Sequence, residues 1–427
     1  MLEINKIRQD KDRIIELLLK KNFQEAQTSI EEVIRLDELK RGVQKNLEAL
    51  KAELNTKSRE IGMLMKDGKK EEAEKTKEEV GNIKDEERKL SEEFSKYDAK
   101  LEELLFTIPN TPHHSIPIGQ SSEDNEVCLE KGIIPDLGED AKPHWELCEE
   151  YDIVDFELGN KITGSGFPLY KGKGAKLQRA LINFFLDEAD KAGYREMQVP
   201  LMVNEASAMA TGQLPDKEGQ MYNIPLDGFY MIPTSEVPLT NIFRDVILKE
   251  DDFPIKLTGY SQCFRREAGS YGKDVRGLNR LHQFDKVEIV CIEHPKNSYN
   301  RLQIMKEHVS SLLDKLELPY RVLKLCGGDI SFTAALTFDF EVYSAAQKRW
   351  LEVSSVSNFE TFQSNRMKLR FRNQENRMEL AHTLNGSALA LPRVLAALLE
   401  NNQDQKGIRI PKVLVEYTGF EYIEAVE

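Results

Sequence analysis

A heptad pattern in the first hundred residues restricts what this part of the chain can fold into. Apolar side chains, with a few charged ones, recur there in steps of three and four along two series. The first series is Val33, Leu36, Lys40, Val43, Leu47, Leu50, Leu54, Lys57, Ile61 and Leu64, and the second is Ala73, Thr76, Val80, Ile83, Glu87, Leu90, Phe94, Tyr97, Leu101 and Leu104. This spacing is typical of a coiled-coil seam. Because Lys66-Asp67-Gly68-Lys69 between the series indicates a turn, the sequence predicts an antiparallel helical hairpin with arms about 50 Å long.

The hairpin by itself leaves its role open, since an oligomerisation device or a spacer has the same pattern. Gly62 and Gly81 lie near the tip and predict some local flexibility there. The lysines of the hairpin are interspersed with glutamates, so a solvated surface is the default interpretation of any one of them. They include Lys57, Lys66, Lys69, Lys70, Lys75 and Lys77.

The rest of the chain has a different character, because prolines appear from Pro109 onwards. Residues 106–170 indicate a linker with short ordered elements that leads into the following domain. Residues 176–192 form an amphipathic helical pattern, and strand-like runs cover 260–264, 286–292 and 337–343. We therefore predict an α+β fold: a helical hairpin arm over 1–105, the linker over 106–170, and a domain over 171–427 with a mainly antiparallel sheet flanked by helices.

Charge and cysteine content limit the location and the partners. The net charge of −14 requires any nucleic-acid contact to be made by locally gathered basic residues. The five cysteines are scattered without a CxxC pair, which argues against a zinc site and against a disulfide framework. The N-terminus is charged, and no apolar run is long enough to span a bilayer. These features predict a soluble cytoplasmic protein with no membrane partner.

Four polar segments carry the chemistry, and they begin at Phe264-Arg265-Arg266-Glu267, Phe284-Asp285-Lys286-Val287-Glu288, Glu352-Val353-Ser354-Ser355 and Asn385-Gly386-Ser387. The sequence has no Walker A match, because Gly166 to Lys173 is one residue too long and lacks the following Ser or Thr. A nucleotide would therefore be held by side chains and a metal ion.

The first two segments predict a pair of strands joined by a loop that faces the substrate. Arg265 and Glu267 follow a strand-like run, and alternation predicts that both point into one site. Phe284 and Glu288 share one face of the returning strand, where Phe284 is suited to stack on adenine and Glu288 to hold an ammonium or a hydroxyl. The segment Gly269–Asn279 between them is predicted to be mobile. The alternative is an ordinary surface hairpin with a core phenylalanine.

The remaining segments supply polar partners for an amino acid and for phosphates. Thr234 and Glu236 suit a small amino acid's amino group, although a capped helix start has the same pattern. Glu352 and Ser355 suit a magnesium ion that bridges ATP phosphates. Arg393 precedes an apolar helical run and supplies a cation for the phosphates, unless it is only a surface arginine.

These segments resemble motifs 2 and 3 of the class II aminoacyl-tRNA synthetases, and their residues are most similar to those of the bacterial seryl-tRNA synthetases. The resemblance implies serine binding by Thr234, Ser235, Glu236, Glu288 and Ser387. It implies ATP binding by Arg265, Arg266, Glu267, Phe284, Glu352, Val353, Ser354, Ser355 and Arg393, with magnesium on Glu352 and Ser355. Arg265, Glu288 and Arg393 are the expected catalytic residues.

The resemblance also implies partners and a reaction. Serine is activated by ATP to seryl-adenylate and then transferred to tRNA(Ser), or to tRNA(Sec) where the organism has it. The hairpin is expected to bind the long variable arm of the tRNA, and residues 194–203 to lie at a homodimer interface. We expect residues 385–387 to wall off threonine, so that a larger residue at Gly386 crowds the pocket.

Three other interpretations compete with this one. A relative that loads a carrier protein lacks the hairpin, and so does a threonine or proline synthetase of the same class. A non-catalytic coiled-coil protein with a degenerate synthetase domain is disfavoured, because the chain retains Arg265, Glu267, Glu288, Glu352 and Arg393.

Overall fold

The computed structural model describes residues 1–216, 218–267 and 276–424. Its contacts divide the chain into two compact units. One unit comprises Leu2–Leu19 and Phe23–Pro109, and the other comprises Met1, Lys20–Asn22 and Asn110–Glu427.

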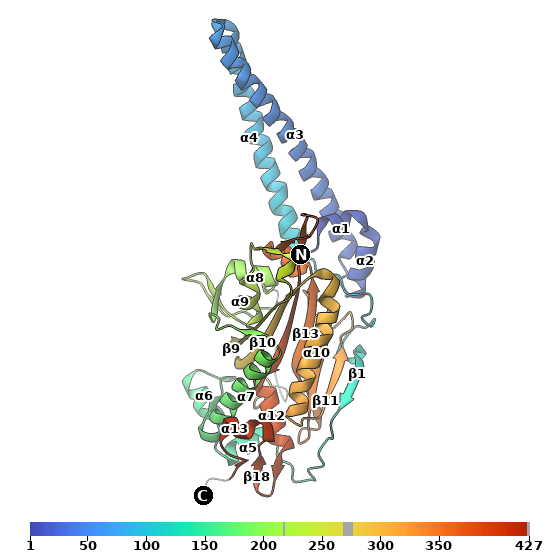
Figure 1. The fold of residues 1–427 in the computed structure, drawn as a ribbon, viewed down its shortest axis with the longest axis vertical. Coiled ribbons are helices and arrows are strands. Elements are labelled where there is room, and N and C mark those ends of the chain that lie inside the picture. The colour runs from blue at the N-terminus through green and yellow to red at the C-terminus, as the bar shows by residue number, and fades with distance from the viewer. Residues whose placement is uncertain (217, 268–275, 425–427) are drawn as a thin grey trace. The chain divides into compact units, whose positions relative to one another are not determined.

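The smaller unit is helical and contains the predicted hairpin. Two short helices, α1 (Ile4–Gln9) and α2 (Lys11–Lys20), precede α3 (Ala26–Lys66) and α4 (Lys70–Thr107). Figure 1 shows α3 and α4 side by side along their length. The seam residues of both heptad series pack between them, and Ala73 at 0% exposure is fully covered. At 41 residues, α3 is about 60 Å long.

The two hairpin glycines do not interrupt the helices. Gly62 lies inside α3 and Gly81 inside α4. Apart from adjacent residues and the backbone of the same helix, no described atom lies within 4 Å of the position that a Cβ would take at either glycine. The local flexibility expected at these positions stays a prediction.

The larger unit is built on a sheet that is antiparallel at every pairing except one. Among the described residues its strand order is β1-β11-β12-β13-β16-β10-β9-β4, and only β4 and β9 are parallel. The strands are β1 (Glu126–Lys131), β11 (Tyr320–Lys324), β12 (Leu336–Ser344), β13 (Arg349–Glu360), β16 (His382–Ala390), β10 (Gln283–Glu293), β9 (Ile255–Phe264) and β4 (Arg195–Glu196). The predicted α+β fold, with its helical hairpin and mainly antiparallel sheet, is confirmed.

Helices bury one face of this sheet. The long helices are α7 (Gly172–Lys191), α10 (Ser298–Lys315) and α12 (Leu391–Asn401), and Figure 1 shows α10 lying along β13. All three contribute apolar side chains to a single core with the central strands. This packing fixes which face of each strand remains for polar chemistry.

The region after the hairpin is more regular than its prolines suggest. Strand β1 pairs with β11 and extends the central sheet at its edge. Three short helices follow in this unit, α5 (His144–Glu150), α6 (Phe156–Ile162) and, further along, α8 (Glu205–Thr211). No helix within the described residues is both long enough and apolar enough to cross a bilayer.

The peripheral elements of the larger unit are short. Its remaining described α-helices are α9 (Glu236–Asn241), α11 (Phe362–Met367) and α13 (Lys412–Thr418). Four small sheets join the remaining strands in the orders β15-β14-β8, β17-β18-β19, β2-β3 and β5-β7-β6. Their strands are β2 (Val154–Asp155), β3 (Leu169–Tyr170), β5 (Met202–Asn204), β6 (Asn223–Ile224), β7 (Phe229–Met231), β8 (Ile247–Lys249), β14 (Arg370–Arg372), β15 (Met378–Leu380), β17 (Gln403–Asp404), β18 (Gly407–Arg409) and β19 (Tyr422–Ile423).

Candidate active site

A polar cavity of about 590 Å³ lies on the sheet face opposite the long helices. Its walls include most of the residues singled out in the sequence: Thr234, Glu236, Arg265, Glu267, Phe284, Glu288, Glu352, Val353, Ser354, Ser355, Ser387 and Arg393. These residues come from segments up to 159 positions apart, since the first is 234 and the last is 393. The fold therefore gathers the four polar segments into one site.

Strand alternation explains how β10 serves both the core and the cavity. Val287, Ile289 and Cys291 pack into the core beneath the helices. The residues between them point the other way, so Lys286 and Glu288 line the cavity. Lys286 has the same alternation as Phe284 and Glu288, and sequence reasoning should have included it for that reason.

The closed end of the cavity holds a compact charged cluster. Lys286 Nζ lies 2.6 Å from Glu288 Oε2 and donates a hydrogen bond of 2.8 Å to Thr234 Oγ1. Thr234 Oγ1 also lies within hydrogen-bond distance of Glu288 Oε2, at 3.3 Å. Glu288 is 1% exposed, so this carboxylate is held by protein partners on one side and faces the cavity on the other. Such a group is well placed to accept a hydrogen bond from a small polar ligand.

Glu236 adds a second buried carboxylate at this end. Its backbone N–H donates to Thr234 Oγ1 at 3.1 Å, so the segment is both a helix start and part of the cavity wall. Gln363 Nε2 donates to Glu236 Oε1 at 2.7 Å. Burial, and then the negative charge of Glu288, raises the pKa of Glu236 to about 7. Because two carboxylates lie here with only Lys286 as a cation against Glu288, this end is suited to an ammonium ion.

Sheet register brings Ser387 to the same end. Ser387 of β16 pairs directly with Glu288 of β10, so their side chains share one face as cross-strand neighbours. Ser354 Oγ donates to the Ser387 carbonyl at 2.6 Å and fixes the backbone there.

The expected role of Gly386 is wrong. A Cβ at Gly386 would lie 3.2 Å from Val356 Cγ2 and 3.5 Å from Ile289 Cγ1, both in the core. Only Asn385 and Ser387 of this segment line the cavity. A larger residue at position 386 therefore crowds the core beneath the sheet rather than the pocket, because alternate residues of a strand point to opposite faces.

A further part of the cavity wall is cationic and aromatic. The Arg265 guanidinium lies 5.2 Å from the centroid of the Phe284 ring, and Arg265 Nε donates to the Pro233 carbonyl at 3.3 Å. Arg393, in the first turn of α12, donates from Nη1 to the Glu352 carbonyl at 2.8 Å. Two guanidinium groups and a ring in this part of the wall suit a base with attached phosphates.

The surroundings of Glu352 fit a hard cation. Ser355 Oγ lies 3.4 Å from Glu352 Oε1, and Asp339 of β12 pairs with Ser355 across the strands. Asp339 Oδ1 is buried and accepts no hydrogen bond from the described residues. Burial, and then the charge of Glu352, raises the pKa of Asp339 well above its usual value. Oxygen donors of this kind, completed by substrate phosphates, are what Mg²⁺ prefers.

No larger metal cluster exists in the described part of the chain, where no three His, Cys, Asp or Glu side chains are grouped to hold an ion. The magnesium assignment therefore depends on ATP supplying further oxygens. Asp339 was missed in the sequence because its only signal is its register opposite Ser355, which a single strand does not reveal.

Several predicted residues lie elsewhere or only partly in view. Ser235 is fully buried and hydrogen-bonds Ser261 Oγ, and Arg266 lies over the Tyr222 ring at 5.9 Å. Neither belongs to the cavity wall, and their assigned roles stay predictions. Strand β9 ends before Arg265, and Glu267 lies in the left-handed region with φ of 49°. This turn, rather than strand alternation, directs Glu267 to the cavity.

The loop predicted to be mobile, 269–279, lies mostly outside the described residues, which resume at 276. Its last residue, Asn279, is 4% exposed and lines the cavity. Its carbonyl accepts a hydrogen bond of 2.9 Å from Arg393 Nε. Asn279 was not singled out in the sequence, where nothing distinguishes it from other loop residues.

Comparison with known proteins identifies the class to which this fold and cavity belong. Residues 222–402 match the family model of the tRNA synthetase class II core domain (G, H, P, S and T). The antiparallel sheet, with a cavity lined by side chains in place of a phosphate-binding loop, is therefore the core of a class II aminoacyl-tRNA synthetase. Residues 1–112, which include the hairpin, match the seryl-tRNA synthetase N-terminal domain.

Full-length relatives give the family. A serine--tRNA ligase of Salinibacter ruber is 52% identical over 427 residues and covers 100% of both chains. One of Exiguobacterium sibiricum is 45% identical and covers 98% of both. The crystal structure of a seryl-tRNA synthetase from Pyrococcus horikoshii complexed with ATP has a TM-score of 0.88 and 31% identity, with 100% of both chains covered. The chain belongs to the seryl-tRNA synthetase family.

Proposed function

We propose that this protein activates L-serine with ATP and transfers the seryl group to tRNA(Ser). Membership of the seryl-tRNA synthetase family supports the reaction. One observation carries the choice of amino acid: the closed end of the cavity presents the buried carboxylate of Glu288 opposite Ser387, beside Glu236. A hydroxyl and an ammonium are the groups that such a pocket binds best.

The first step needs orientation and charge stabilisation rather than a protein nucleophile. A serine carboxylate oxygen attacks the α-phosphorus of ATP, the bond to the β-phosphate oxygen breaks, and pyrophosphate leaves with the electron pair. Arg265 and Arg393 stabilise the charge that develops on the phosphates, and Glu236 and Glu288 hold serine in line. Phe284 supports the adenine.

In the second step the 3′-hydroxyl oxygen of the terminal adenosine attacks the seryl carbonyl carbon. The bond from that carbon to the phosphate oxygen breaks, AMP leaves with the electron pair, and the hydroxyl proton is released. Glu352 and Ser355 would hold Mg²⁺, with Asp339 Oδ1 beside them, and the ion would neutralise phosphate charge. We assign tRNA binding to the arm of residues 1–105, a connecting role to 106–170 and catalysis to 171–427. A homodimer, a cytoplasmic location and charging of tRNA(Sec), where present, complete the proposal on the basis of the sequence features above.

The direct test is amino-acid-dependent pyrophosphate exchange with each of the twenty amino acids. We expect exchange with serine to exceed exchange with alanine or threonine by several orders of magnitude. Comparable exchange with another amino acid, and little with serine, would refute the proposed substrate.

The titration of Glu236 predicts how serine binding depends on pH. Its raised pKa of about 7 means that the free pocket is largely protonated below pH 7 and charged above it. Because the ammonium binds the charged form, the KM for serine should rise as pH falls from 8 to 6, approaching about tenfold per unit below pH 7. Exchange kinetics across this range provide the measurement.

Glu236→Gln is the matched control, since the amide oxygen still accepts from Gln363. We expect this variant to bind serine weakly at every pH and to lose the rise in KM. The same titration lowers the free energy of unfolding of the serine-free parent as pH increases from about 4.5 to 7, because the folded state holds a proton that the unfolded chain releases. A parent KM that is flat from pH 8 to 6 would contradict the assignment.

A substitution at Glu352 tests the magnesium site. Glu352→Ala should lower adenylate formation by at least about a hundredfold and shift the magnesium midpoint of pyrophosphate exchange upward, since a carboxylate ligand is lost. The fold should persist, because the Glu352 side chain is 49% exposed. Glu341→Ala removes the carboxylate directly opposite Glu352 on β12, which is paired with Arg321, and should leave the magnesium midpoint unchanged. Parent-like rate and midpoint in Glu352→Ala would make Glu352 a structural residue only.

A further inference from the structure

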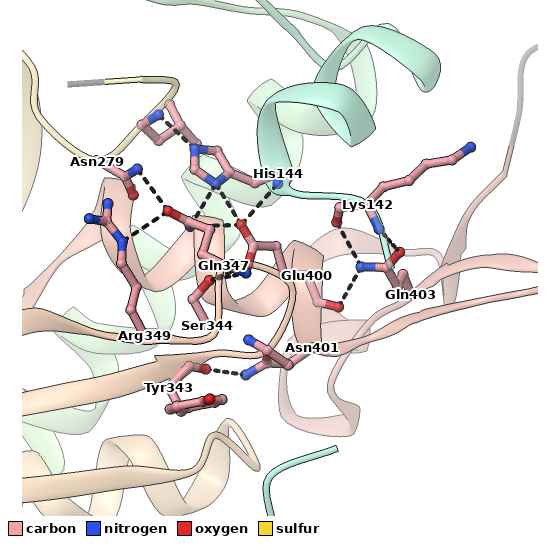
Figure 2. Close-up of polar contacts among 12 residues, drawn as sticks. Lys142, His144, Asn279, Tyr343, Ser344, Gln347, Arg349, Glu400, Asn401 and Gln403 are labelled. Carbon is pink, nitrogen blue, oxygen red and sulfur yellow. Dashed lines mark hydrogen bonds and ion pairs between the residues drawn. The ribbon is translucent and has the colours of Figure 1, made fainter. Parts of the chain in front are cut away.

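A fully buried histidine–glutamate pair lies beside the cavity and is not part of its walls. His144 opens α5 and Glu400 lies in the last turn of α12, and both side chains are 0% exposed. His144 donates to Glu400 Oε1 from its backbone N–H at 2.9 Å and from Nδ1 at 2.7 Å (Figure 2). Ser344 and Gln347 also donate to Glu400. A buried carboxylate with four hydrogen bonds is held in one orientation.

The pair fixes the tautomer of His144 and aims its other nitrogen. Although burial opposes ionisation, the hydrogen bond from His144 and its neighbours hold the pKa of Glu400 below its usual value. Since a carboxylate only accepts, Nδ1 carries the proton and Nε2 is an acceptor. Leu278 N–H donates to Nε2 at 2.8 Å. Glu400 thus orients an acceptor toward the segment that returns from the loop.

The close approach of this segment depends on a glycine. Gly277 has φ of +66°, and a Cβ there would lie 2.3 Å from His144 Nε2. The backbone therefore passes directly over the imidazole edge, where only glycine fits.

A second anchor holds the next residue. Gln347, which donates to Glu400, accepts from Asn279 Nδ2 at 3.0 Å (Figure 2). The Asn279 carbonyl then accepts from Arg393 Nε at 2.9 Å. Arg393 and Glu400 are seven residues apart on α12, which places them on the same side of the helix. Residues at both ends of α12 therefore hold the segment 277–279 in place. Arg393 contacts it directly, and Glu400 acts on it through His144 and Gln347.

We infer that His144 and Glu400 are positioning residues for ATP activation: they fix segment 277–279, and through Asn279 they fix the orientation of Arg393 toward the phosphates. The pair acts through the loop and touches neither serine nor ATP. The inference rests on the proposed function for the identity of the substrates. Its effect should fall on ATP and spare serine, because among the described residues no hydrogen bond or ion pair joins Glu236 or Glu288 to this network.

Two substitutions of His144 separate its two hydrogen bonds. In His144→Gln the amide oxygen can replace Nε2 as the acceptor for Leu278 N–H. In His144→Asn the shorter amide can still donate to Glu400 in place of Nδ1, but it leaves the buried Leu278 N–H without a partner. Steady-state pyrophosphate exchange with varied ATP and varied serine, together with thermal melting, measures both variants.

We expect His144→Asn to raise the KM for ATP about tenfold or more and to lower kcat, with the KM for serine within about twofold of the parent value. His144→Gln should remain within about threefold of the parent in every constant. Gln347→Leu removes the second anchor at an incompletely buried position and should repeat the ATP effect. Asn402→Ala, which removes side-chain hydrogen bonds to the Leu398 carbonyl and from Arg409 at the same end of α12, should leave both KM values unchanged.

Three outcomes would overturn the inference. They are equal ATP effects in His144→Asn and His144→Gln, equal losses for ATP and serine, and lowered melting temperatures with parental kinetic constants. If the two His144 variants do not fold, Gln347→Leu decides by the same ATP-to-serine comparison. Failure of the parent to exchange pyrophosphate with serine would instead refute the proposed function, so the two failures are distinguishable.

Discussion

Replacing Glu288 with alanine should abolish most serine activation and narrow the preference for serine over alanine. Serine is small, so an apolar pocket gains little from its methylene group and selection has to use the hydroxyl. A pocket built to hydrogen-bond a hydroxyl rejects an analogue that lacks it by about 10⁴ or more, because its polar groups stay unpaired. Glu288 is 1% exposed and lies directly opposite Ser387, so a serine hydroxyl would donate its hydrogen bond to the Glu288 carboxylate. We expect kcat/KM for serine to fall about a thousandfold or more.

The structure adds a complication to this test. Glu288 is the ion-pair partner of Lys286 at 2.6 Å, and a buried lysine left unpaired can destabilise the fold by about 3–5 kcal/mol. Glu288→Gln avoids much of this cost, since its amide oxygen still accepts from Lys286. Both variants should be measured with serine, alanine and threonine, alongside their thermal melting.

Glu379→Ala, which removes an exposed carboxylate of β15, serves as the control and should behave as the parent. If the folded Glu288→Ala and Glu288→Gln variants keep the parental ratio of kcat/KM for serine to kcat/KM for alanine, some other residue recognises the hydroxyl. Threonine is a separate case, because rejection of its methyl depends on the cavity wall around Asn385 and Ser387.

Removing most of the hairpin should leave serine activation nearly intact and cripple tRNA charging. Residues 42–96 belong to the smaller unit, and the described walls of the cavity run only from Gln213 to Arg393. Lys40 and Asp98 form an ion pair at 2.5 Å, so a short glycine linker can join the cut ends without straining the base of the hairpin. We expect pyrophosphate exchange within about twofold of the parent and aminoacylation of tRNA(Ser) reduced by at least about a hundredfold. The reason is that contacts to the phosphate backbone of the nucleic acid dominate affinity, and the deleted arm would no longer make them.

The two assays distinguish the possible readings of the arm. Loss of exchange in a folded, truncated protein would show that the hairpin supports the catalytic unit. Undiminished charging would show that it does not bind tRNA. Either result contradicts the proposed division of labour.

A milder change near the tip tests the electrostatic part of this proposal. Replacing Lys66, Lys70 and Lys75 with glutamine should weaken tRNA binding and reduce the slope of log affinity against log salt by up to about two to three units, since fewer counterions are released. Glu71→Gln with Glu78→Gln alters neighbouring charge of the opposite sign and should not flatten the slope. An unchanged slope in the triple lysine variant would mean that these lysines form only a solvated surface.

Local periodicity determined much of the fold directly from the sequence. The heptad seam of the hairpin depends on steps of three and four, and the strand faces depend on alternation, so neither needs information from distant residues. The turn at residues 66–69 and the helices on either side of it follow from the same local rules. For this reason the hairpin and the strands around Phe264, Glu288 and Asp339 were found where the structure has them.

Register and packing decided what the sequence left open. The pairing of Glu288 with Ser387 depends on how β10 meets β16, and Gly386 faces the core because α10, together with α7 and α12, covers that side of the sheet. Asp339 joins Glu352 only through the pairing of β12 with β13. Strand register is set by the burial of whole strand faces, and the sequence of a single strand does not reveal which residues of another strand it will pair with.

The His144–Glu400 pair marks the limit of sequence reasoning most clearly. Its two residues are 256 positions apart, and each alone looks like an ordinary residue near the end of a helix. Only the docking of α5 against α12 brings them together and excludes water around them, which makes their hydrogen bonds obligatory. The sequence thus specified the elements and the chemical groups of this protein, and the tertiary structure decided which groups act on one another.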